Sequence, residues 1–140
     1  MKEEIEYKLE MLEERLDRLE DHQRVDLEEF VDDKVIQDAV ERNFQVAIEI
    51  VLDISSMVVS KESLRKPENY RESIRRLAEI EILEEEFVER FESAASFRNV
   101  LVHHYTEIDP ARVHHYLSEN LDDFRVFIRQ VAEYAKELEQ

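Results

Sequence analysis

A cation, an amide, two imidazoles and a phenol stand within eight residues of this sequence. Arg98 and Asn99 open the stretch, and His103, His104 and Tyr105 close it. A histidine with an ordinary pKa of about 6.5 can accept a proton at neutral pH. An arginine can hold an anion. The stretch therefore has the residue types that proton transfer beside a bound anion requires.

Arg98 falls on a stripe of residues that the sequence predicts to face the core. The spacing of four and three residues joins Phe87, Phe91, Ala94, Arg98, Leu101 and Tyr105. Burying an unpaired guanidinium costs several kcal/mol, so Arg98 either pairs with a carboxylate or is kept for an anion. Glu49 and Asp53 are the only charged residues between positions 44 and 59, and either could oppose Arg98. The sequence leaves both choices open.

The geometry of an ideal helix does not bring all of these side chains together. Arg98 and Tyr105 share a face, and Asn99 lies under His103, but His103 and Tyr105 point in roughly opposite directions. The side chains converge only if the helix ends near His103. Four histidines within thirteen residues also suggest a metal site, but they come as adjacent pairs, and adjacent helical residues diverge by about 100°. We therefore expect no metal.

The sequence from Arg98 to Tyr105, Arg-Asn-Val-Leu-Val-His-His-Tyr, resembles the Arg-x4-His-x-Tyr motif of the HEPN superfamily. The similarity is greatest to the HepT toxins of HepT–MntA toxin–antitoxin pairs. The flanking segments 39–49, with Asp53 beyond, and 108–127 also resemble that family. The resemblance covers roughly residues 26–130.

This resemblance implies an all-α HEPN bundle that dimerises, so that two copies of the motif line a shared cleft. It also implies a metal-independent endoribonuclease without a cofactor. In that reading His103 deprotonates a ribose 2′-hydroxyl, Arg98 holds the phosphate, and Asn99 orients either group. Asp53 and Glu49 are expected to support Arg98, and His104 could replace or assist His103.

The family resemblance gives Tyr105 a regulatory role. In such pairs the antitoxin is a minimal nucleotidyltransferase of the MntA type, and it transfers AMP from ATP to the motif tyrosine. An alternative is a non-catalytic subunit that binds a nucleotide or another substrate for a separate nucleotidyltransferase. A purely structural dimerisation domain is a third reading. The complete motif, with Tyr105, favours the toxin.

Apolar residues recur at three- to four-residue spacing along the chain, without a convincing period of two, which predicts an all-α antiparallel bundle of about five helices. Asn69 and Asp109 are expected to cap helices, with Pro110 as the first residue of the last one. Pro67 marks the one long connection. We expect one domain, 1–140, with helices at 1–22, 26–60 (central), 70–82, 84–104 (carrying the motif) and 110–138.

The charge is unevenly distributed. The chain has a formal net charge of −17, and residues 1–60 alone carry −11, but residues 61–76 carry +3. A chain this acidic cannot coat nucleic acid through its overall field, so any contact with RNA must be local. We expect the basic cluster either to guide RNA or to be an ordinary solvated face. Its members are Lys61, Arg65, Lys66, Arg71, Arg75 and Arg76.

Composition excludes several classes of protein. The 140 residues suit a single domain, and 43% of them are hydrophobic, enough for a core. The absence of glycine excludes Gly-rich phosphate loops, and the absence of cysteine excludes disulfides, thiolate zinc sites and cysteine nucleophiles. No signal peptide and no apolar run of about 20 residues is evident, so we expect a cytoplasmic protein without a membrane partner.

Overall fold

The computed structural model describes residues 1–103 and 108–138 of the chain. Within those two ranges every regular element is a helix and none is a strand, which confirms the predicted all-α class. In chain order the helices are α1 (Lys2–Asp21), α2 (Leu27–Asp32), α3 (Lys34–Lys61), α4 (Tyr70–Glu79), α5 (Glu85–Phe91), α6 (Ser93–His103), α7 (Pro110–Glu119) and α8 (Leu121–Lys136).

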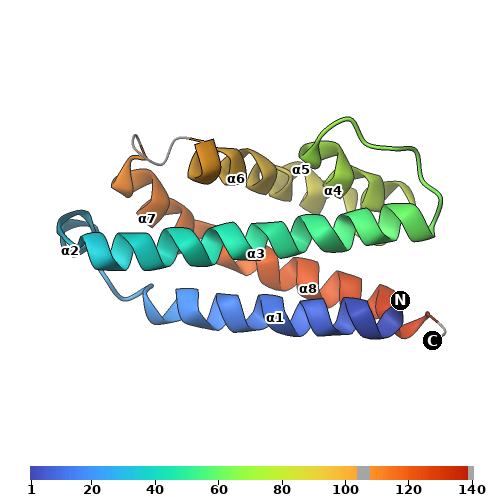
Figure 1. Ribbon diagram of the computed structural model, residues 1–140, viewed down its shortest axis with the longest axis horizontal. Coiled ribbons are helices and arrows are strands. Elements are labelled where there is room, and N and C mark those ends of the chain that lie inside the picture. The colour runs from blue at the N-terminus through green and yellow to red at the C-terminus, as the bar shows by residue number, and fades with distance from the viewer. Residues whose placement is uncertain (104–107, 139–140) are drawn as a thin grey trace.

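The helices form a bundle built around α3 (Figure 1). α1 packs against α3 and α8 and runs opposite to both, so the chain alternates direction along the bundle axis. α4 and α6 cover the side of α3 away from α1, and α5 packs beside them. α2 and α7 pack together at one end. The motif helix α6 therefore lies directly on α3.

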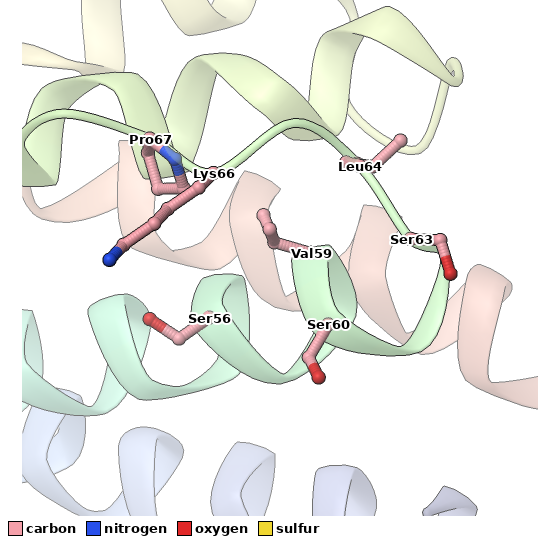
Figure 2. Close-up of a pocket in the computed structure, with 7 residues that line it drawn as sticks. All are labelled: Ser56, Val59, Ser60, Ser63, Leu64, Lys66 and Pro67. Atoms are coloured by element: carbon pink, nitrogen blue, oxygen red, sulfur yellow. The ribbon is translucent and has the colours of Figure 1, made fainter.

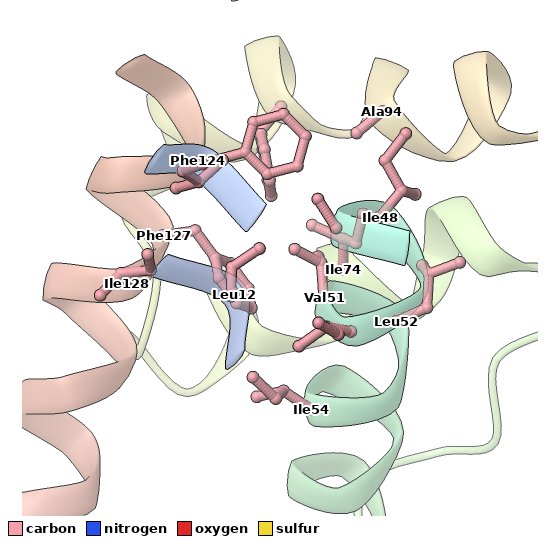
Figure 3. Close-up of a cluster of buried hydrophobic side chains, with 14 of the residues drawn as sticks. Leu12, Ile48, Val51, Leu52, Ile54, Ile74, Ala94, Phe124, Phe127 and Ile128 are labelled. Atoms are coloured by element: carbon pink, nitrogen blue, oxygen red, sulfur yellow. The ribbon is translucent and has the colours of Figure 1, made fainter. Parts of the chain in front are cut away.

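The prediction that the second helical segment is central is confirmed, since α1, α2, α4, α6 and α7 all pack on α3. Its side chains Ile48, Val51 and Ile54 are fully buried. Figure 3 shows them in one cluster with Leu12 of α1 and with Phe124 from α8. The core is thus shared between α3, α1 and α8.

By length and composition α3 would be able to cross a membrane, which differs from our expectation that no apolar run is long enough. Its most apolar window of 18 residues has a mean hydropathy of 1.3. Of that window 61% is buried inside the bundle, where α1, α4 and α6 cover it. The apolar residues are explained by the core that they form.

The segment predicted as one helix over 26–60 is divided at Asp33. The backbone of Asp33 is extended (φ −118°, ψ 97°), and its carboxylate accepts a hydrogen bond from the backbone N–H of Ile36 at 3.1 Å. Aspartate competes with the helix for backbone donors, so it starts a new helix here. The apolar spacing continues across the break and therefore did not reveal it.

Two further predicted helices are also broken, so the estimate of about five helices was too low. The range 84–104 divides at Glu92, whose carboxylate accepts hydrogen bonds from the Arg75 guanidinium at 2.8 and 3.0 Å. The range 110–138 divides at Asn120, a poor helix former with φ −112° and ψ −2°. Neither break changes which residues are apolar.

The predicted caps are confirmed. The side chain of Asn69 accepts a hydrogen bond from the backbone N–H of Glu72 at 2.9 Å, and α4 begins at the next residue. Asp109 does the same for Ala111 at 3.0 Å, with Pro110 as the first residue of α7. These side chains satisfy backbone donors that the first turn of a helix leaves unpaired.

In a chain without glycine, other residues take the left-handed conformation that ends a helix. Ser63 (φ 53°) follows α3, and Glu81 (φ 60°) follows α4. At α3 the N–H of Leu64 reaches back to the carbonyl oxygen of Val59 at 3.0 Å, which is the closing hydrogen bond of a Schellman turn. The turn at Glu81 explains why α4 ends at residue 79, before the predicted end at 82.

An aromatic cluster fixes α6 against α3. The ring of Phe44 on α3 lies 5.7 Å from Phe97 on α6 and 5.1 Å from Tyr116 on α7, both in edge-to-face geometry. Phe97 and Tyr116 are stacked at 4.1 Å. Burial, and the nearby carboxylate of Asp123, raise the pKa of Tyr116 above its ordinary value, so its phenol stays neutral. Because Phe97 is next to Arg98, this cluster sets the position of the motif.

Replacement of Phe44 by alanine should destabilise the fold strongly. Phe44 is fully buried, and its removal leaves a cavity among three aromatic rings, at a cost of about 3–5 kcal/mol. Urea unfolding followed by circular dichroism measures this loss. Val35→Ala, at a position that is 79% exposed, is the control and should change stability by less than about 0.5 kcal/mol. Equal losses in both variants would contradict the assigned packing.

Candidate functional site

Arg98 lies at the junction of α3, α4 and α6, with 19% of its side chain exposed. Its Nη2 atom is 3.8 Å from Oε1 of Glu49 on α3. That distance makes an ion pair but is too long for a hydrogen bond. Asp53, the other predicted partner, is 65% exposed and pairs with Lys8 of α1 at 3.5 Å. Of the two carboxylates, Glu49 is therefore the one that faces Arg98.

The protein offsets the positive charge of the Arg98 guanidinium, and satisfies its hydrogen-bond donors, only in part. Its Nε atom is buried and has no hydrogen-bond partner within residues 1–103 and 108–138. Its Cζ atom lies 5.1 Å from the centre of the Tyr70 ring, within range of a cation–π contact. Glu49 is itself shared, because Oε1 also accepts a hydrogen bond from Nε2 of Gln45 at 3.3 Å. A buried donor left unpaired is costly, so this arrangement suits a group that receives an anion.

Arg98 and Asn99 open into a cavity of about 590 Å³ between α3, α6 and the start of α4. Hydroxyl and amide groups dominate its polar lining. Besides Arg98 and Asn99, the lining residues are Ser56, Pro67, Glu68, Asn69, Tyr70 and Ser73. A cavity of this size can hold a small organic ligand or part of a larger one.

The other motif residues follow Arg98 along α6. Asn99 is exposed and is four residues before His103, so the two positions share a helix face. His103 is the last residue assigned to α6, and its side chain lies outside the described part of the structure. His104 and Tyr105 also lie outside it. Their predicted roles therefore rest on the sequence.

The structure divides the predicted basic cluster. Lys61, Arg65, Lys66 and Arg71 are exposed, as expected of residues that could meet a phosphate chain. Arg71 is 3.4 Å from the hydroxyl of Ser96 on α6, close to the motif. These four cations surround the connection between α3 and α4.

Arg76 does not belong to this cluster, and its prediction as an RNA-guiding residue is wrong. Only 4% of the residue is exposed. Its Nη2 donates to Glu72 at 2.8 Å, and its Nε donates to the backbone oxygen of Arg65 at 3.0 Å. It thus fastens the 62–69 connection onto α4. Arg75 is exposed, but it already forms an ion pair with Glu92. Because that carboxylate partly neutralises its charge, Arg75 attracts a phosphate less strongly.

The sequence did not single out Tyr70, Ser56 or Ser73 as site residues. Tyr70 follows a helix cap, and an aromatic residue at that place gives no signal of its own. The three side chains come together only because the connection after α3 folds back along the bundle (Figure 1).

The remaining histidines have no part in the cavity. Nε2 of His114 makes a hydrogen bond with the backbone oxygen of Val25 at 2.8 Å, and its ring packs on Phe30 at 5.4 Å. His114 therefore joins α7 to the segment before α2. Among the described residues, no group of three or more histidine or acidic side chains could hold a metal ion.

Comparisons with known proteins bear on the whole chain. The sequence model of a family described as Ribonuclease HepT-like matches residues 12–131. A tRNA nuclease HepT from Aphanizomenon flos-aquae is 29% identical over 136 residues, which are 97% of this chain and 92% of that protein. An mRNA nuclease HepT from Shewanella oneidensis is 29% identical over 100 residues, covering 71% of this chain and 75% of that protein.

Solved structures agree with these matches. The tri-AMPylated Shewanella oneidensis HEPN toxin, in complex with an MNT antitoxin, superposes with a TM-score of 0.81 at 27% identity, over 92% of this chain and 96% of that one. A toxin–antitoxin structure with AMP-PNP gives a TM-score of 0.83 at 25% identity, over 92% and 97% of the two chains. The fold is that of the HEPN toxins. Because the family model matches residues 12–131, most of the chain, the chain belongs to the Ribonuclease HepT-like family.

Proposed function

We propose that the protein is a metal-independent endoribonuclease toxin that a cognate nucleotidyltransferase antitoxin neutralises. The observation that carries this proposal is the guanidinium of Arg98, which has a buried donor without a hydrogen-bond partner among the described residues and lines a cavity together with Asn99. The relatives named as tRNA and mRNA nucleases support RNA as the substrate. The structures of toxins with their antitoxins support the partner.

The chemistry needs only groups of the chain. His103 takes the proton of a ribose 2′-hydroxyl, and the 2′-oxygen then attacks the adjacent phosphorus. The bond from phosphorus to the 5′-oxygen breaks, that oxygen receives the proton that His103 took up, and a 2′,3′-cyclic phosphate is left. Arg98 holds the phosphate and stabilises the charge that develops on it, while Asn99 orients the reacting groups. Glu49 keeps the guanidinium in place from the side of α3.

The catalytic unit is a homodimer in this proposal, with the open side of α3 and the motif helix at the contact. On the side of α3 toward the motif, Gln45, Glu49 and Ser56 form a polar stripe that is partly or fully open to solvent. It lies beside the cavity that contains Arg98. Two such faces opposed would place two copies of the motif around one polar cleft.

Removal of Arg98 or His103 should abolish cleavage without unfolding the protein. Arg98→Ala loses stabilisation of the transition state, expected as about a hundredfold to a thousandfold in rate, and His103→Ala loses the general base, with a comparable or larger effect. RNA cleavage is measured in EDTA, with the cyclic phosphate end as the diagnostic product. Arg129→Ala, an exposed arginine on α8, is the control and should cleave normally.

Two outcomes would contradict this assignment. Cleavage that requires a divalent metal would remove the metal-independent mechanism. An unmodified wild-type protein that binds the nucleotidyltransferase but leaves structured and unstructured RNAs intact would favour the non-catalytic subunit instead.

Tyr105 should be the acceptor of AMP. Incubation with the nucleotidyltransferase, ATP and magnesium should stop cleavage and add the mass of one or more AMP units, because AMP brings bulk and negative charge to the cleft. Tyr105→Phe should cleave RNA before and after the same treatment, without added mass. The control Tyr7→Phe, at an exposed tyrosine on α1, should be inactivated like the wild type. Intact-mass measurement decides between a modified Tyr105 and another acceptor.

The isolated protein should be a dimer at micromolar concentration. Light scattering should give twice the chain mass of 16.9 kDa. A monomer that is active on RNA would contradict the composite cleft, although the assignment of Arg98 would stand.

A further inference from the structure

The cavity beside Arg98 adjoins a second cavity along the 62–69 connection. The second one has a volume of about 450 Å³ and is bounded by Val59, Ser60, Ser63, Leu64 and Lys66 (Figure 2). Ser56 and Pro67 line both. We call the two adjoining cavities the linker groove. It leads away from Arg98, between α3 and the connection that Arg76 fastens to α4.

An aromatic ring stands beside the cation at the start of the linker groove. Tyr70 is 47% exposed, although the guanidinium of Arg98 lies against its ring. A ring that is partly open next to a phosphate-binding cation is how proteins hold single-stranded RNA, because each base has a face that can stack and each nucleotide has a phosphate.

The groups further along the groove suit the rest of a nucleotide. Asn99 and Ser56 are exposed neutral side chains that have no hydrogen-bond partner among the residues described. Glu68 also lines the groove, and a carboxylate accepts a hydrogen bond from an exocyclic amino group of a base. Lys66 follows the groove next to Pro67 in Figure 2, on the side of Ser56 where the two cavities meet, and supplies a second cation there. The groove therefore combines two cations, a partly open aromatic ring and neutral polar groups.

We infer that the linker groove binds the nucleotide next to the scissile phosphate of a single-stranded RNA. The base of that nucleotide contacts the ring of Tyr70, and its own phosphate lies toward Lys66. This inference rests on the proposed function, because it places the scissile phosphate at Arg98. It also gives an acidic protein a local way to hold RNA, since stacking and two cations act where the overall field repels a polyanion.

The test measures binding of an RNA that cannot be cleaved. A fluorescein-labelled octamer of 2′-O-methyl RNA lacks the attacking hydroxyl, and its anisotropy gives a Kd for each variant. Tyr70→Leu should weaken binding about tenfold, the effect of losing one stacked base, whereas Tyr70→Phe should stay within about twofold. Tyr7→Leu is the matched control: it is 63% exposed on α1, outside the groove, and should not change the Kd.

Two further experiments serve as controls. The first separates the contribution of base stacking from that of the phosphate charges, and the second separates a change in the groove from a loss of the fold. An abasic octamer keeps the phosphates, so it should bind wild type and Tyr70→Leu equally. Ser56→Leu fills the groove where the two cavities meet, from an exposed position that does not affect the core, and should weaken the normal octamer as Tyr70→Leu does. Circular dichroism must show wild-type helicity in each variant.

The outcomes distinguish this inference from the function on which it rests. Unchanged binding in both Tyr70→Leu and Ser56→Leu, with a wild type that binds and cleaves RNA, overturns the inference alone. A wild type that neither binds nor cleaves RNA overturns the proposed function as well. AMP that competes with the octamer at an equal or lower concentration would make the groove a mononucleotide site and would also overturn the inference.

Discussion

The guanidinium of Arg98 is mostly buried, but the protein gives it only part of the ion pairing and hydrogen bonding that a buried cation requires. The site depends on this condition. A hydrogen-bonded carboxylate would neutralise the arginine and leave no room for an anion. Full exposure would let water and salt screen its charge. Glu49, at 3.8 Å and shared with Gln45, and the ring of Tyr70 hold the group between these limits. A phosphate that binds there can then supply the negative charge and the hydrogen-bond acceptors that the protein does not supply.

A partly paired, mostly buried cation such as Arg98 keeps its position only in rigid surroundings. The fold provides them on two sides of the cavity. On one side Phe44, Phe97 and Tyr116 lock α6 to α3 and α7, one residue away from Arg98. On the other, the buried Arg76 of α4 donates a hydrogen bond to the backbone oxygen of Arg65 and another to Glu72, which ties the 62–69 connection to α4. A rigid aromatic core and a fastened connection together keep the cavity open beside the arginine. The same connection carries two exposed cations, Arg65 and Lys66.

This arrangement also reconciles a net charge of −17 with a nucleic-acid substrate. The acidic residues are spread over the outer faces of the bundle, whereas Lys61, Arg65, Lys66 and Arg71 gather around one connection beside the cavity. Charges separated by more than a Debye length of about 8 Å are largely screened at physiological salt, so a local group of cations can act against the overall field. In the proposed function, this contrast favours contact of RNA with the site over contact with the rest of the surface.

The features that could be predicted from the sequence are those that depend on near neighbours in the chain. The three- to four-residue spacing gave the helices, Asn69 and Asp109 gave two caps, and the motif from Arg98 to Tyr105 gave the family, since each depends only on residues a few positions apart. The helix breaks at Asp33, Glu92 and Asn120 were not predicted from the sequence, because they leave the apolar pattern unchanged. Tertiary structure alone decided that Glu49 faces Arg98, that Arg76 is buried, and that Tyr70 borders the cavity. Periodicity fixes the face of a helix on which a residue lies, but the partner across that face is set by packing between segments that are far apart in sequence.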